Sequence, residues 1–247
     1  MRLDKFICKS TDLTREQAIA EIDSAQVTVN GVVILEPATQ VHEDNSILLA
    51  GSPLSLRPSR YMMLHKPLHT LSSNVDGDYP SVMNILIQAG FDKVCDLHIT
   101  GRLDADTTGL MLITDDGRWS FNIINPKYLC SKRYRVTLRD AIVLSQFEQL
   151  VERFAKGIAL PGEAKLTLPA KLEAVSCGAG GINEVHLTIQ EGRYHQVKRM
   201  FAAIGNRVNG LHRESIGAVT LDIPVGEWRY LSADEVNSFT VEQLSLD

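Results

Sequence analysis

Apolar residues recur at helical spacing in the first part of the chain. Residues 2–9 predict a short helix, and a second helix follows Thr14. Thr14 and Gln17 have the Thr-x-x-Gln spacing of a capping box, and apolar residues follow on one helix face. The chain is therefore expected to begin with two short helices.

A hairpin and a linker are predicted next. Two runs of β-branched residues, 27–29 and 32–34, flank Asn30-Gly31. This dipeptide is a strong hairpin signal because a type I′ turn needs positive φ at both central positions. Residues 51–59 contain two prolines and small polar side chains, which indicate a linker. The pattern thus predicts a small N-terminal module over residues 1–50.

The pattern changes from residue 60 onward. Short apolar runs are separated by turns and a few helical stretches, which predicts an α+β domain with a mostly antiparallel sheet and flanking helices. Residues 61–67 predict its first strand, and residues 81–89 predict a helix packed on the core. The domain is expected to span residues 60–240, with an acidic tail at 241–247.

Composition narrows the classes of partner. The chain has 247 residues, a formal net charge of -5 and 44% hydrophobic residues, so a nucleic-acid partner must be held by local basic patches. Four widely spaced cysteines form no CxxC pair, and neither a zinc site nor a disulfide framework is indicated. No signal-like segment or apolar run of about 20 residues is present, which predicts a cytoplasmic protein that does not associate with membranes.

The segment 101–109 places a carboxylate, Asp104, on a glycine-bounded loop directly before the apolar run 110–113. A calcium loop is one alternative, because five residues fall at EF-hand positions: Asp104, Asp106, Thr108, Gly109 and Asp115. Against it, the apolar run indicates a buried strand, the last position is Asp rather than Glu, and no amphipathic helix enters. We expect no metal, although a turn-forming role for Asp104 stays open at this point.

Two further segments offer side chains suited to a nucleotide. In 132–138, a period of two places Tyr134 and Lys132 on one face and Arg133 and Arg135 on the other. Tyr134 is either the wall of an apolar slot or an ordinary core tyrosine.

The second segment is a strand over 185–189 that turns at Glu191-Gly192 and leads into a helix over about 195–204. Lys198 lies on this helix. A solvated basic face accounts for Arg193 and Arg199 better than for Lys198.

The N-terminal pattern resembles a known family. Arg2-Leu3-Asp4 at the start and residues 27–31 at the hairpin are similar to the S4 RNA-binding domain, over about residues 1–50. S4 domains usually offer basic side chains on the second helix, whereas this chain has acidic ones, so RNA binding by the module is expected to be weak. A cap that only packs on the larger domain is the alternative.

The larger region resembles the RsuA/RluB/RluE/RluF class of pseudouridine synthases. Residues 101–117 match its catalytic motif, in which the Asp after Arg-Leu is essential, and 61–67 and 211–217 extend the match. Two positions depart from the family pattern, since His65 replaces Asn and His69 replaces a frequent Gly. The resemblance implies an α+β synthase domain that isomerises uridine to pseudouridine in ribosomal RNA without a cofactor.

Residues 191–217 are more similar to the members that act on the small subunit. Large-subunit members usually carry Asn-Arg-Gln/Glu-Val-Arg-Arg where this chain has residues 194–199. The resemblance therefore implies uridine 516 of 16S ribosomal RNA as the target.

The resemblance also implies roles. Asp104 is the essential carboxylate, Tyr134 stacks on the flipped base, and Lys198 pairs with Asp104, with Arg199 as the alternative partner. Lys66 either steers phosphate or is a solvated strand end. The residues expected to bind RNA are Arg102, Lys66, Lys132, Arg133, Arg135, Arg193, His195, Gln196, Arg199 and Arg213. A monomer is expected because no heptad repeat is present. A non-catalytic ribosome-assembly factor is the alternative function.

Overall fold

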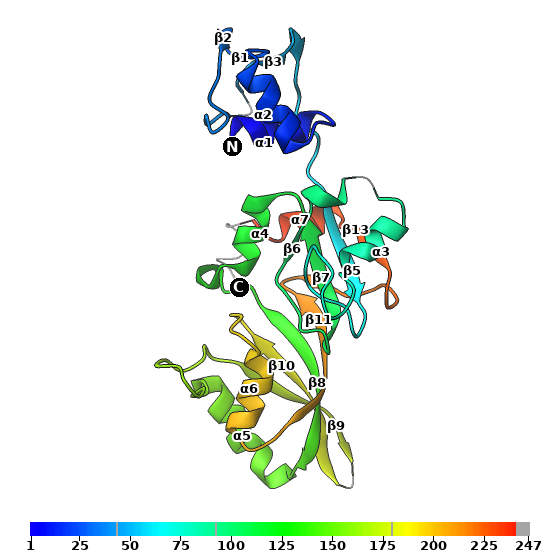
Figure 1. The fold of residues 1–247 in the computed structure, drawn as a ribbon. Coiled ribbons are helices and arrows are strands. Elements are labelled where there is room, and N and C mark those ends of the chain that lie inside the picture. The colour runs from blue at the N-terminus through cyan, green and yellow to red at the C-terminus, as the bar shows by residue number, and fades with distance from the viewer. Residues whose placement is uncertain (43, 92, 179, 241–247) are drawn as a thin grey trace. The chain divides into compact units, whose positions relative to one another are not determined.

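The computed structural model describes residues 1–240 except 43, 92 and 179. The chain divides into two compact units, residues 1–59 and residue 60 onward (Figure 1). The expected acidic tail, 241–247, lies outside the described residues. Among the helices that the structure describes, none combines the length and the apolar character that a membrane crossing requires.

The N-terminal unit consists of two helices and a small antiparallel sheet with strand order β2-β1-β3-β4. Thr14 and Gln17 cap the second helix reciprocally, and this confirms the predicted capping box. Asn30 and Gly31 join β1 to β2 with φ of 53° and 81°, as the hairpin prediction requires. The elements are α1 (Leu3–Ser10), α2 (Arg15–Asp23), β1 (Val27–Val29), β2 (Val32–Val33), β3 (Ile47–Leu49) and β4 (Ser52–Pro53).

The expected linker differs in its first residues. Ser52 and Pro53 form β4, which pairs with β3 across a turn at Ala50-Gly51. Ala50 and Gly51 have φ of 46° and 80°, so a second hairpin forms where the prolines indicated a linker. Pro53 is tolerated because β4 is an edge strand, where a missing N–H leaves no ladder hydrogen bond unmade.

The second unit is built on a nine-stranded sheet, and its main strand order is β13-β5-β7-β11-β8-β10-β9. β6 pairs with the C-terminal end of β7, and β12 pairs with the C-terminal end of β11. Of the described strand pairs, β7 with β11 is parallel and the others are antiparallel, which confirms the predicted α+β class. The strands are β5 (Tyr61–Lys66), β6 (His98–Thr100), β7 (Thr108–Thr114), β8 (Lys132–Ile142), β9 (Lys171–Gly178), β10 (Gly181–Ile189), β11 (Val208–Ile216), β12 (Val219–Thr220) and β13 (Trp228–Tyr230).

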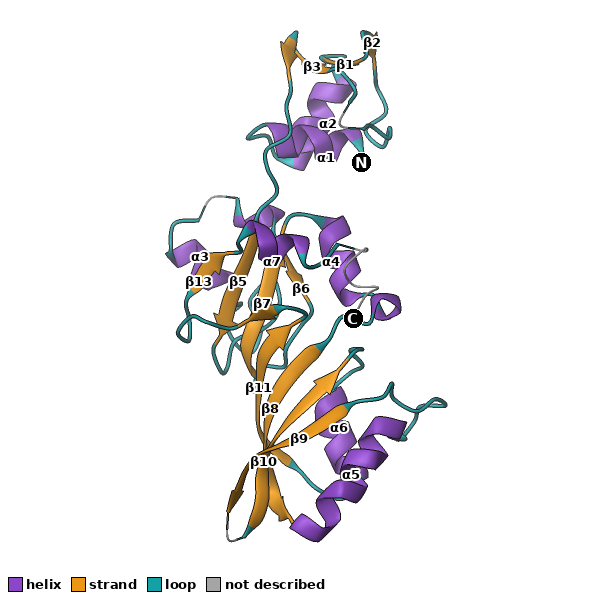
Figure 2. Ribbon diagram, turned by 180° about the vertical axis from the view of Figure 1, so that it is seen from behind, coloured by secondary structure: helices purple, strands orange, loops and turns teal. Residues whose placement is uncertain are grey.

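Helices cover the sheet in two groups, which Figure 2 shows from behind. Met111 and Ile113 of β7 pack in one apolar cluster with side chains of α3, α5 and α6. Leu110 and Leu112 pack on the other side, in a cluster that includes side chains of α4. Both faces of β7 are therefore buried, which explains its continuous apolar run. The helices are α3 (Met83–Gln88), η1 (Val94–Asp96), α4 (Gly117–Ile124), η2 (Pro126–Tyr128), α5 (Leu144–Lys156), α6 (Gln196–Ala203) and α7 (Ala233–Asn237).

The parallel join between β7 and β11 is unusually close. Thr108 pairs with His212, and Gly109 pairs with Arg213. Gly109 has a φ of 117°, and a Cβ at this position would lie 2.3 Å from the carbonyl oxygen of Arg213. Only glycine fits such an approach. The join connects β7, which follows the Asp104 loop, to β11 and through it to β8.

Candidate active site

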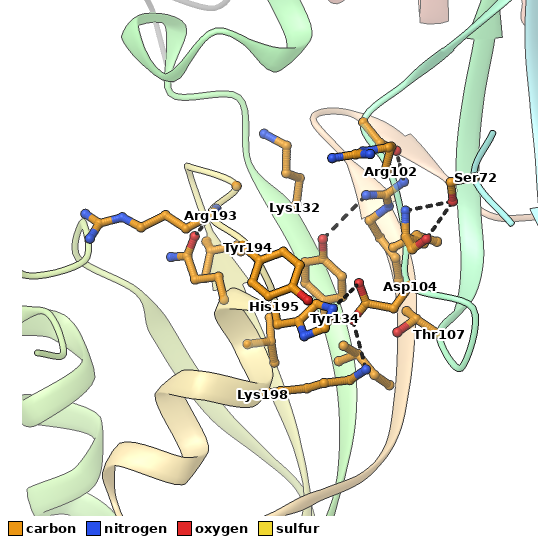
Figure 3. A pocket seen from close by; sticks show the side chains of 18 of the residues that line it. Ser72, Arg102, Asp104, Thr107, Lys132, Tyr134, Arg193, Tyr194, His195 and Lys198 are labelled. Carbon is orange, nitrogen blue, oxygen red and sulfur yellow. Dashed lines mark hydrogen bonds and ion pairs between the residues drawn. The ribbon is translucent and has the colours of Figure 1, made fainter. Parts of the chain in front are cut away.

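A pocket of about 540 Å³ opens in the second unit. Its walls come from the loop 101–107, from β8, and from the segment 192–198 that enters α6 (Figure 3). These segments are far apart in the sequence, and the sheet brings them together. Of the candidate residues, the pocket is lined by Asp104, Tyr134, Lys198, Arg102, Lys132, Arg193, His195, Gln196 and Arg213.

Asp104 lies in this pocket with a partner at each carboxylate oxygen. Lys198 Nζ donates to Oδ2 at 2.8 Å, and His195 Nε2 lies 3.3 Å from Oδ1. Lys198 also donates to Asp106 Oδ1 at 2.6 Å. Figure 3 shows Asp104 and Lys198 pointing toward one another from opposite walls. The side chains of Asp104 and Lys198 are 29% and 25% exposed, so the pair is partly screened from water.

Lys198, Asp104 and Asp106 carry opposite charges that favour each other's charged form. Burial lowers the pKa of the Lys198 ammonium, but its hydrogen bonds to Asp104 and Asp106 outweigh this and hold the pKa above its usual value. The hydrogen bond from Lys198 holds the pKa of Asp106 below its usual value. Lys198 is thus a stable cation opposite two carboxylates.

The backbone of the Asp104 loop is fixed by a buried lysine. Lys66 is 0% exposed, and its Nζ donates to the carbonyls of Pro67 at 2.9 Å, Thr107 at 2.8 Å and Ala105 at 3.3 Å. The expectation that Lys66 steers phosphate or is a solvated strand end was therefore wrong. Burial lowers the pKa of this ammonium to about 8.

Arg213 fixes the same loop from β11. Its side chain is buried, with Nε donating to the carbonyl of Leu110 at 2.7 Å and a terminal nitrogen donating to that of Gly101 at 3.0 Å. We expected Arg213 to contact RNA. The structure instead leaves it 1% exposed, with its guanidinium hydrogen-bonded to backbone carbonyls. Ser72 adds a further brace, because its hydroxyl donates to the carbonyl of Leu103 at 2.6 Å and accepts from the same residue's N–H.

Tyr134 lines the pocket from β8, an interior strand of the sheet. It is 7% exposed, and its hydroxyl lies 3.4 Å from a terminal nitrogen of Arg213. The predicted alternation of β8 is confirmed: Lys132, Tyr134 and Val136 are buried on one face. Lys132 Nζ donates to the carbonyl of Cys130 at 2.7 Å, and burial lowers the pKa of this ammonium.

Acidic side chains organise the opposite wall. Glu191 accepts from Gln196 Nε2 at 2.9 Å, from Arg193 Nε at 3.0 Å and from a backbone N–H of the neighbouring loop. Arg193 and Arg199 both pair with Glu163. Arg199 is therefore held away from Asp104, and the structure places Lys198 there. Gln196, which was expected to bind RNA, is 4% exposed, and its side-chain amide donates to Glu191.

Comparison with known proteins identifies the family. The model of the RNA pseudouridylate synthase family matches residues 60–203, and that of the S4 domain matches residues 1–47. The chain belongs to the pseudouridine synthase family. It is 48% identical to ribosomal small subunit pseudouridine synthase A of Vibrio cholerae over 96% of this chain and 99% of that protein. The identity to the Escherichia coli protein of the same name is 44%, over 96% and 99%.

A solved structure agrees with this assignment. A crystal structure of a pseudouridylate synthase superposes with a TM-score of 0.67 at 43% identity, covering 97% of this chain and 100% of that one. The protein is thus an isomerase with an S4 domain followed by a synthase domain, as the resemblance implied.

Arg133 and Arg135 of the synthase lie on the face of β8 opposite to Tyr134. Arg135 donates twice to Glu184, at 2.7 and 2.9 Å, and Arg133 lies 2.6 Å from His186 Nδ1. Neither lines the pocket. Arg102, by contrast, is exposed at the pocket, and no hydrogen bond or ion pair engages its guanidinium among the residues that the structure describes.

Sequence reasoning missed three side chains of the synthase site: Ser72, Asp106 and Tyr194. Asp106 carried a signal, since it stands two residues after Asp104 in the catalytic motif. Tyr194 begins the segment 194–199, on which the resemblance to small-subunit members partly rests, yet its exposed position was not predicted. Within the described residues, no group of three or more His, Cys, Asp or Glu side chains is arranged to hold a metal ion.

Proposed function

We propose that the synthase isomerises uridine 516 of 16S small-subunit ribosomal RNA. The relatives named as small-subunit enzymes match nearly the full length of the chain, and the S4 domain suits an RNA substrate. The observation that carries the proposal is the Asp104–Lys198 pair in a pocket walled by Tyr134. Because ribosomal RNA is the substrate, the proposal places the reaction in the cytoplasm. The proposed active form is a monomer.

The reaction needs no redox partner. The bond between uracil N1 and ribose C1′ breaks, the base rotates, C5 bonds to C1′, and the C5 proton is released while N1 gains one. The target uridine must first leave its stack at a cost of a few kcal/mol. Stacking on Tyr134 in the pocket returns about 1–3 kcal/mol of this cost.

Asp104 is the catalytic carboxylate in this proposal, acting at the sugar. It either attacks C1′ directly or removes the C2′ proton to form a glycal. Both routes need a charged carboxylate beside the ribose. Deuterium at C2′ separates them: the glycal route gives a primary isotope effect on uracil detachment or a loss of the label, and direct attack at C1′ gives neither.

Lys198 keeps Asp104 ready for this step. When the bound nucleotide displaces water, an isolated carboxylate tends to take up a proton, whereas a nearby cation favours the charged form. The ammonium donates to Oδ2, which fixes the carboxylate rotamer and leaves Oδ1 beside His195. Lys198 is therefore a positioning residue with an electrostatic role.

The decisive test is tritium release from small-subunit RNA labelled at uridine C5, supplied as naked RNA and as a partly assembled particle. We expect release by the wild type, and a loss of at least about 10³-fold in Asp104→Ala with RNA affinity retained, because the reacting carboxylate is gone. Asp140→Ala is the matched control, since Asp140 is exposed on β8 and pairs with Arg139.

The position of the product is read by mapping pseudouridine along the RNA. Modification of another uridine overturns the assignment to position 516. Binding of small-subunit RNA without release from any form favours the assembly-factor function.

A further inference from the structure

Tyr194 is 75% exposed, more than any other large apolar side chain among the described residues. It also lines the catalytic pocket. An exposed aromatic ring loses hydrophobic stabilisation, so a ring kept at the mouth of a binding pocket suggests contact with a ligand.

The ring is held in place although it is exposed. It stacks on His195 with centroids 3.9 Å apart and an interplanar angle of 18°. His195 has a φ of 47°, a left-handed conformation that is costly for a residue with a side chain, and its Nε2 reaches Asp104. One face of the Tyr194 ring is thus covered by His195, and its high exposure leaves the other face to solvent.

The pocket therefore contains two tyrosines at different depths. Tyr134 is 7% exposed and belongs to the interior, whereas Tyr194 stands at the rim (Figure 3). The flipped uracil requires the inner position, because Asp104 must reach its ribose. A base stacked at the rim must come from a different nucleotide of the same strand.

We propose that Tyr194 is a stacking platform for an RNA base next to the target uridine. The inference rests on the proposed function and deepens it, since it assigns a contact for the strand beside the flipped nucleotide. Base stacking on an exposed aromatic tolerates any sequence, because every base has a π-face. The platform fixes the path of the strand and thereby the depth at which the target enters the pocket.

Steady-state kinetics of tritium release test the platform with three variants, Tyr194→Ala, Tyr194→Leu and Tyr194→Phe. We expect the first two to lower kcat/KM by about 5- to 150-fold, mostly through KM, which corresponds to the range measured for single base–aromatic stacks. Tyr194→Phe keeps the ring and should recover most of the kcat/KM that is lost in Tyr194→Ala. Tyr230→Ala is the control, because Tyr230 is 52% exposed and does not line the pocket.

Fluorescence identifies the base. RNA that carries 2-aminopurine on the 5′ or the 3′ side of the target should be quenched on binding the wild type at one of the two positions, and not on binding Tyr194→Ala. Quenching that is equal in both proteins, or an Ala variant with wild-type KM, overturns the platform. A Phe variant as impaired as Ala assigns the effect to the hydroxyl and also overturns it.

Failure of the proposed function has a different signature. If the wild type releases tritium from large-subunit RNA only, the substrate proposal is wrong, and the same variants are compared on that RNA. If it releases none from any RNA, both proposals fall.

Discussion

The two walls that face each other across the pocket are held by opposite chemistry. The loop 101–107 is fixed by the buried cations Lys66 and Arg213, which donate to its backbone carbonyls and to those next to it. The segment 191–199 is fixed by the carboxylates Glu191 and Glu163, which accept from its arginines. One wall is thus held through its backbone and the other through its side chains.

The difference shows what a basic residue near an active site does. Around the Asp104 loop, buried cations hold carbonyls and add positive potential beside a carboxylate that must stay charged. On the opposite wall, Arg193 and Arg199 form ion pairs with carboxylates, and Lys198 is the residue that pairs with Asp104. Much of the basic character expected to grip RNA is therefore used inside the protein.

Breaking the contact between the two walls should have the largest effect. Lys198→Met removes the cation from Asp104 and Asp106 but preserves most of the side-chain volume. We expect kcat to fall about 100-fold, comparable to truncating one partner of a hydrogen-bonded charge pair, with a change in KM below about threefold. Lys198→Arg should recover part of this loss.

Arg199→Met is the matched control for Lys198, because Arg199 lies on the same helix and pairs with Glu163 instead. Single-turnover rates separate chemistry from RNA binding. Equal losses in the two variants would contradict the assignment of Lys198 as the partner of Asp104.

Loosening the backbone-held wall should have the next largest effect. Lys66→Met removes three hydrogen bonds to carbonyls, and we expect kcat to fall about tenfold because the Asp104 loop is less well placed. The variant should also change how stability depends on pH.

Burial lowers the folded-state pKa of Lys66 to about 8, below the ordinary value of 10.5. Between these values the unfolded chain binds a proton that the folded protein does not, so the free energy of unfolding contributed by Lys66 rises with pH. We expect this rise between pH 8 and 10.5 to be absent in Lys66→Met. Urea titrations at several pH values measure the free energy of unfolding. If it depends on pH in the same way in the wild type and in Lys66→Met, Lys66 keeps its ordinary pKa.

Weakening the side-chain-held wall should have a smaller effect. Glu163→Gln removes the carboxylate that Arg193 and Arg199 share, and its hydrogen bonds with them hold the pKa of Glu163 below its usual value. We expect activity to fall by less than about fivefold, because the site is partly exposed and Glu191 still holds Arg193. An effect as large as that of Lys198→Met would contradict the distinction between the two walls.

The smallest expected effect concerns the arginines that remain for RNA. Arg102→Gln should reduce the slope of log affinity against log salt by about 0.7–1, because one phosphate contact is lost. Arg135→Gln should leave the slope unchanged, since Arg135 pairs with Glu184 on the opposite face of β8. Filter binding over a range of salt measures both. Equal reductions would return Arg135 to the RNA interface.

The sequence predicted the elements because their signals are local. The Asn30-Gly31 turn, the Thr14 capping box and the alternation along β8 depend on neighbours within a few residues, and each is present in the structure. The continuous apolar run 110–113 likewise indicated a buried strand, and the structure buries both of its faces. The hairpin that ends at Pro53 was missed because Pro53 and the nearby Pro58 are typical of linkers too.

The roles of the cations could not be predicted in the same way. Lys66, Arg193 and Arg213 are basic residues in matching motifs, and nothing in their local sequence tells a phosphate contact from a carbonyl contact. Their partners lie between 1 and 112 residues away in the chain, and most of them are in loops that the sheet brings together. Only the pairing of distant strands determines which cations are buried.

The close parallel join at Gly109 brings together two stretches of chain that share the catalytic machinery. Asp104 and Lys66 precede the connection from η2 to β8, whereas Tyr134, Lys198 and Arg213 follow it. A cut in that connection yields two fragments, neither of which contains a complete pocket. In the intact chain the two stretches are joined where β7 pairs with β11 and where β13 pairs with β5. The catalytic site is thus assembled from two successive stretches of the synthase domain, and neither stretch alone carries both Asp104 and Lys198.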